Sequence, residues 1–85
     1  MTEPDPLPPP PFPRTHYFAF DVLVRRSYLD IYDIIHVLQK TFKRIKQLNG
    51  RYRLWGIIFQ KKMWLTVITL EDGETVHNAY KSDPP

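Results

Sequence analysis

The sequence predicts an α+β fold in which a single helix packs on a mainly antiparallel sheet, with the order β-α-β-β-β and a disordered proline-rich N-terminal tail. Two observations carry this prediction. Apolar residues alternate over 16–25 and again after residue 51, whereas between 31 and 45 they recur at helical spacing. All nine prolines lie in the first 13 residues or the last two, so 14–82 is predicted as one small α+β domain.

The tail, residues 1–13, contains seven of the nine prolines. Consecutive prolines fix φ and remove backbone donors, which favours an extended polyproline II segment without a core. Residues 7–13 are a candidate ligand for a proline-recognition domain, and Pro8-Pro9-x-x-Phe12 resembles one class of EVH1 ligand. The alternative is that the tail is a stiff spacer.

The first strand is predicted at 16–25. Apolar residues occupy every second position here, so in a strand their side chains share one face; they are Phe18, Phe20, Val22 and Val24. We expect that face to supply part of the core.

The single helix is predicted to follow directly. Ser27 with Asp30 three residues later resembles a capping box, and Asp33 adds acid where the helix dipole favours it. Apolar residues then recur three and four apart, at Ile31, Ile34, Ile35, Leu38, Phe42 and Ile45. Asn49-Gly50 predicts the end of this helix, because glycine tolerates the left-handed conformation of a helix cap.

Three strands are predicted to complete the sheet, at 52–60, 63–70 and 75–81. Lys61-Lys62 separates the first two. Asp72-Gly73 separates the last two and is a strong signal for a hairpin turn.

Two-residue turns at both positions define the register. They pair Leu65 with Ile58 and with Tyr80, and they pair Thr69 with Val76. One sheet face then holds Leu54, Ile58, Leu65, Val67, Val76 and Tyr80, and the other holds Trp55, Ile57, Phe59, Trp64, Ile68 and Leu70. One helix covers only one face, so the second requires a curled sheet or another chain, such as the second copy of a homodimer.

Charge is segregated along the chain. Residues 34–62 contain eight basic and no acidic side chains, whereas the two flanking regions are net acidic. A basic block that contains aromatic residues suits nucleic acid, since cations neutralise phosphates and aromatic rings stack on bases. We therefore expect a small non-enzymatic RNA- or DNA-binding protein, of a regulatory kind. The expected contacts are Lys40, Lys43, Arg44, Arg51, Tyr52, Arg53, Lys61 and Lys62.

A second hypothesis is that the protein is an adaptor or inhibitor that acts through protein contacts. An acidic protein surface would satisfy the same basic block. The contact surface would be the second apolar face, a sheet edge or the tail. On that face the expected interface residues are Trp55, Phe59 and Trp64.

Several functional classes are not expected. The chain contains no cysteine, and His16, His36 and His77 are dispersed, so neither a metal nor another cofactor is predicted. No nucleophile is spaced to meet a general base, so no enzymatic activity is predicted. An apolar run of about 20 residues is missing from the sequence, and its N-terminus is acidic rather than basic and apolar. We expect no membrane contact and a cytoplasmic or nuclear location.

Overall fold

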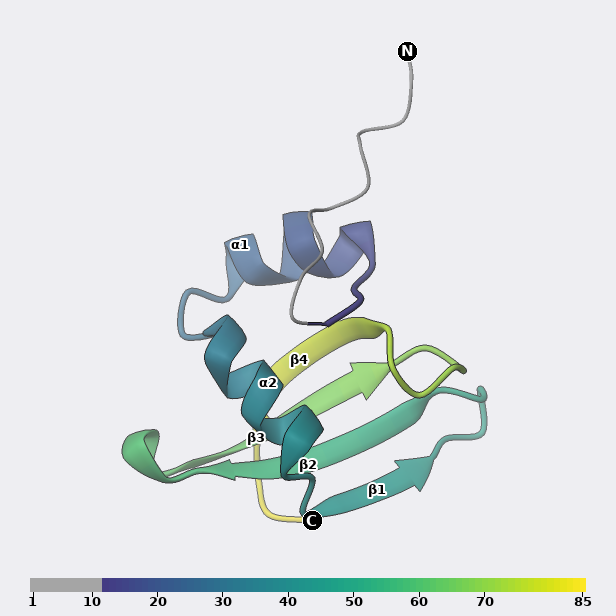
Figure 1. The fold of residues 1–85 in the computed structure, drawn as a ribbon. Helices are drawn as coiled ribbons and strands as arrows, with labels where there is room; N and C mark the ends of the chain where they lie inside the picture. Colours follow the sequence, from purple (N-terminus) through teal and green to yellow (C-terminus); the bar gives the residue numbers. More distant parts are fainter. Residues whose placement is uncertain (1–11) are drawn as a thin grey trace.

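A computed structural model describes residues 12–85, and it shows helical segments followed by a four-stranded antiparallel sheet (Figure 1). The elements are η1 (Phe18–Val22, π-helical), α1 (Leu23–Arg25), α2 (Ile31–Gln39), β1 (Lys43–Lys46), β2 (Tyr52–Ile58), η2 (Phe59–Lys61, 3-10 helical), β3 (Met63–Thr69) and β4 (Val76–Ser82). The predicted α+β class and antiparallel sheet are confirmed, but the order β-α-β-β-β and the single helix are wrong. Residues 1–11, which hold most of the predicted tail, lie outside the described residues.

The four strands are neighbours in sequence order, and the helices cover one face of the sheet. α2 lies across β2 and β3, and η1 packs against β4 (Figure 1). The core lies between these layers and contains Phe12, Phe18, Val22, Ile34, Val37, Leu54, Ile58, Met63, Leu65, Val67, Val76 and Ala79. We call the face that packs on this core the inner face. Within residues 12–85, no helix is long and apolar enough to span a membrane.

The segment predicted as the first strand is helical. Phe18 and Val22 are fully buried, whereas Phe20 and Val24 are 58% and 72% exposed, so the four side chains do not share a face. A spacing of four residues suits a helix turn as well as a strand, and here the helix is selected. The hydroxyl of Thr15 accepts a hydrogen bond from the backbone N–H of Phe18 at 3.1 Å and satisfies one free donor at the helix start.

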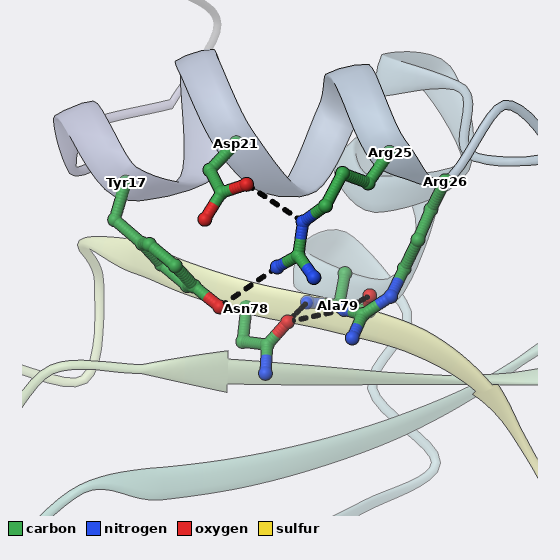
Figure 2. Close-up of polar contacts among 6 residues, drawn as sticks. All are labelled: Tyr17, Asp21, Arg25, Arg26, Asn78 and Ala79. Atoms are coloured by element: carbon green, nitrogen blue, oxygen red, sulfur yellow. Dashed lines mark hydrogen bonds and ion pairs between the residues drawn. The ribbon is translucent and has the colours of Figure 1, made fainter.

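The free edge of β4, on the side away from β3, is hydrogen-bonded by side chains from the end of the first helical segment and the loop after it. Nη1 of Arg26 donates to Oδ1 of Asn78 at 2.6 Å and to the carbonyl of Ala79 at 2.9 Å (Figure 2). The backbone N–H of Lys81 donates to the hydroxyl of Tyr28 at 3.2 Å. These contacts satisfy backbone groups that an edge strand otherwise presents to other chains.

The chain just before the first helix also pairs with β4. The N–H of Val76 donates to the carbonyl of Pro13 at 2.9 Å, and the carbonyl of Val76 accepts from the N–H of Thr15 at 3.0 Å. Phe12 is buried and meets the ring of Phe18 edge-on, with centroids 6.2 Å apart. Phe12, which the EVH1-like pattern would present to a partner, is therefore part of the core.

α2 begins later and ends earlier than predicted. Its N-cap is Asp30, whose Oδ1 accepts from the N–H of Tyr32 at 2.8 Å, so the predicted start at Ser27 is wrong. It ends at Gln39, not at Asn49-Gly50.

The last two residues of the predicted helical stripe lie outside α2. Ile45 lies in β1, and Phe42 directly precedes that strand and donates its N–H to the carbonyl of Trp55 at 2.7 Å. β1 pairs with β2 from Lys43–Trp55 to Lys46–Tyr52, which gives β2 a backbone partner that a longer helix would have denied it. Tertiary pairing has overridden the local helical spacing. Gly50, at φ +88°, serves the β1–β2 turn.

The β2–β3 hairpin has a longer loop than predicted. Ile58 pairs with Met63 rather than Leu65, because η2 and Lys62, at φ +51°, form the connection. The shift is two residues, and an even shift leaves every side chain on its predicted face.

The β3–β4 hairpin contains an irregularity that the sequence analysis does not predict. Thr69 pairs with Val76 as predicted, but the turn is not the predicted two-residue turn, because the N–H of Gly73 donates to the carbonyl of Leu70 at 3.0 Å. The register then shifts by one residue between Ile68 and Thr69. A bulge of this kind moves every later residue to the opposite face. Ala79 therefore replaces Tyr80 on the inner face, and the predicted Leu65–Tyr80 pair is wrong.

Candidate functional site

The sheet face opposite α2, which we call the outer face, is formed by alternate residues of all four strands. They are Lys43 and Ile45 from β1, Arg53, Trp55 and Ile57 from β2, Trp64, Thr66 and Ile68 from β3, and Asn78, Tyr80 and Ser82 from β4. No helix of residues 12–85 packs on this face. Its strand positions include two basic side chains, Lys43 and Arg53, several apolar side chains and no carboxylate.

Arg53 lies between two aromatic rings at the centre of the outer face. Its guanidinium carbon is 4.4 Å from the ring centroid of Trp55 and 5.8 Å from that of Tyr80. Trp55 is only 6% exposed. Nε of Arg53 is buried and has no hydrogen-bond partner among residues 12–85. A guanidinium held over aromatic rings keeps its positive charge and its other donors available to an anion.

A second aromatic group lies at one end of the outer face. The rings of Phe42 and Trp64 meet edge to face with centroids 4.9 Å apart. Trp64 is half-buried, but Phe42 is 63% exposed because it lies outside the helix that the spacing predicted for it. The backbone hydrogen bond from Phe42 to β2 fixes the backbone from which this ring extends. The pair presents a rigid aromatic surface to solvent.

β1 forms a basic edge beside the outer face. All four of its residues are exposed, and in the described chain it pairs with a strand on one side only. Arg44 and Lys46 point to the inner side, where the Arg44 guanidinium lies 4.2 Å and Nζ of Lys46 lies 5.9 Å from the ring of Tyr52. Lys43 points to the outer face. Cations therefore line both sides of this edge.

The other predicted contacts do not join one patch. Lys61 and Lys62 lie in the β2–β3 loop, and Nζ of Lys61 lies 2.5 Å from a carboxylate oxygen of Asp33. This hydrogen bond raises the pKa of Lys61. Lys40, exposed, caps the C-terminus of α2.

Arg51 lies at the opposite end of the sheet from the β2–β3 loop. It lines a shallow hollow with Leu70, Glu71 and Asp72. Its charge is therefore close to two carboxylates, unlike the charges of the outer face.

The three residues predicted for a protein interface have different environments. Trp55 is buried under Arg53, Trp64 is half-buried beside Phe42, and Phe59 is exposed in η2, within the β2–β3 loop. The sequence analysis missed Phe42 and Ile45 as surface residues, because their helical spacing assigned them to the core.

His77 lies at the bulge, close to the first helical segment. Its ring is 4.9 Å from that of Tyr17, and Nδ1 is 3.1 Å from the hydroxyl of Thr15. Burial, and secondarily the charge of Arg51, lower the pKa of His77. Within the described part of the chain, no three His, Cys, Asp or Glu side chains are grouped to hold a metal ion.

Comparison of the chain with family models, curated proteins and solved structures finds no match. Functional inference therefore rests on the outer face and the β1 edge themselves.

Proposed function

We propose that this chain is a small non-enzymatic protein that binds nucleic acid through the outer face and the β1 edge. The observation that carries the proposal is the combination of cations with the exposed ring of Phe42 and the half-buried ring of Trp64, on a surface whose strand positions hold no carboxylate. Cations release the counterions of a phosphate backbone, and aromatic rings add contacts to the bases.

The distribution of charge supports this surface over the rest of the described chain. Lys43 and Lys46 are exposed on an edge strand, and Arg53 is held by ring stacking rather than by an acidic partner. Lys61, in contrast, is already paired with Asp33. We therefore assign the principal phosphate contacts to β1 and Arg53, and assign only peripheral contacts to Lys40 and to the β2–β3 loop.

Fluorescence anisotropy of labelled RNA and DNA over a range of salt concentrations tests the proposal. Binding should weaken linearly with salt on logarithmic axes, with a slope of about −0.7 to −0.9 for each phosphate contacted. Lys43→Glu with Lys46→Glu should reduce both the affinity and the slope. The matched control is Lys81→Glu, which reverses an exposed lysine at the far edge of the sheet. Absence of binding at low salt would refute the proposal.

A second function, docking of a protein, is favoured by the apolar residues of the same face. Ile45 is exposed and Ile57 is half-buried on a surface that no helix of residues 12–85 covers. A partner protein or a second copy of this chain would bury them. Sedimentation equilibrium with Ile45→Glu tests this function, since a dimer or complex that uses the face should dissociate.

A further inference from the structure

We infer that the nucleic acid is single-stranded and that one of its bases stacks on the aromatic pair of Phe42 and Trp64. The inference rests on the proposed function and specifies the ligand of the same surface. Its phosphates would follow Lys43 and Arg53, the two basic residues at strand positions of the outer face.

The width of the sheet argues against readout of a duplex. Neighbouring strands lie about 4.8 Å apart, so the outermost two of four strands are roughly 14 Å apart before side chains are added. The major groove of B-DNA is about 12 Å wide, and that of an RNA helix is too narrow for side chains to read. The outer face as a whole is therefore too wide to enter either major groove, whereas it can lie along a single strand whose bases are unpaired.

The aromatic pair is placed to receive an unpaired base. Phe42 is 63% exposed, its ring contacts Trp64 edge to face, and its backbone is bonded to β2. Trp55 is a poorer platform, because the guanidinium of Arg53 already covers it. Stacking on a rigid ring is favourable for every base, so this mode predicts binding with little sequence preference.

The charge of the face favours this occupant over an apolar protein surface. Its charged strand residues, Lys43 and Arg53, are both cationic. An apolar partner would desolvate these two cations without supplying a counter-charge, whereas a phosphodiester chain supplies one at every nucleotide. Two of the largest apolar side chains, Trp55 and Ile68, are already buried within the monomer, which reduces the gain from a protein partner.

The test compares a labelled single strand of about 10 nucleotides, a length typical of small single-strand-binding domains, with the duplex of the same sequence. The variant is Phe42→Leu, which keeps an apolar side chain but removes the ring. The matched control is Phe20→Leu, since Phe20 is similarly exposed but lies on η1. Thermal melts of both variants establish that each is folded.

We expect the single strand to bind more tightly than the duplex. Phe42→Leu should weaken single-strand binding by about 5- to 140-fold, the equivalent of one lost base stack, and Phe20→Leu should leave it unchanged. The salt slope should not change in Phe42→Leu, because stacking releases no counterions. Binding should also quench tryptophan fluorescence through Trp64.

The outcomes separate this inference from the proposed function. Salt-dependent binding with equal affinity for both forms, or equal effects of Phe42→Leu and Phe20→Leu, would overturn the inference and leave the proposed function standing. No binding of either nucleic acid at low salt would overturn both. Self-association that Phe42→Leu abolishes, in a protein that binds neither form, would instead identify the outer face as a protein interface and would also overturn both.

Discussion

Gly56 is the position at which one added methyl group tests the packing of α2 against the sheet. A Cβ at residue 56 would lie 2.7 Å from Cγ2 of Val37 and 3.2 Å from its Cα. Val37 is fully buried in α2, so its side chain has little room to move. Glycine in β2 thus allows the helix to approach the inner face closely.

The expected effect of Gly56→Ala is the balance of two terms. Overpacking of a well-packed core costs about 1–3 kcal/mol of unfolding free energy. Replacing glycine by alanine in a strand returns roughly 0.5–1 kcal/mol, because glycine loses more backbone entropy on folding. We expect a net loss of about 1–2 kcal/mol, which in a domain of this size lowers Tm by roughly 5–15 °C.

Urea denaturation of Gly56→Ala, Val37→Ala and the double variant measures this packing. Val37→Ala removes the clash with Cγ2, but the backbone of α2 remains 3.2 Å from the added methyl group, so Gly56→Ala should cost less in that background without becoming free of cost. A coupling of about 1 kcal/mol is expected for residues that touch directly. If Gly56→Ala proved as stable as the natural chain, the close approach of α2 to β2 would be refuted.

Three further predictions concern the core and the pH dependence of stability. Phe12→Ala should cost about 3–5 kcal/mol in urea denaturation, because the ring is buried, whereas exposed Phe20→Ala should change stability by less than about 0.5 kcal/mol. The pKa of His77 is lowered in the folded state, so the unfolded chain binds more protons. The contribution of His77 to stability should therefore be fully present above about pH 6.5 and decline below it. His77→Gln should abolish that part of the decline in unfolding free energy between about pH 7 and pH 5. Hydrogen bonds, first of all from the Thr75 hydroxyl, lower the pKa of the Asp72 carboxylate. The contribution of Asp72 to stability should therefore be present above about pH 4 and lost below it. Urea midpoints of the natural chain and of Asp72→Asn at about pH 5 and pH 3 measure this, and an equal loss of stability in both proteins would contradict it.

The C-terminal half of the fold is predictable because its signals are local. The Asp-Gly turn places Gly73 at φ +73° and sets the Thr69–Val76 pair. Alternation assigns Leu54, Leu65 and other residues of β2 and β3 to the correct face, and the two-residue error in the first hairpin does not disturb that assignment. The bulge in β4 has no comparable signal, so Tyr80 is misplaced.

The candidate site is predictable in its residue types but not in its arrangement. Sequence reasoning selects Lys43, Arg53 and Trp64, and these residues share the outer face. It also selects Lys61 and Arg51, which lie at opposite ends of the sheet. Composition indicates a basic, aromatic surface; only strand pairing determines which of its members are neighbours.

The N-terminal half shows why local pattern is insufficient. A separation of four residues, as between Phe18 and Val22, places two side chains on one face of either a strand or a helix. The three-residue step from Phe42 to Ile45 fits the spacing of a helix, although these residues are not helical in the structure. Sequence alone therefore establishes that Phe18 and Val22 share a face, and establishes the hairpins, the polar turns and the segregated charge. The tertiary structure decides the rest: Thr15 caps a helix beside β4, and residues predicted to be helical pair with β2 as β1, which leaves Phe42 exposed to solvent.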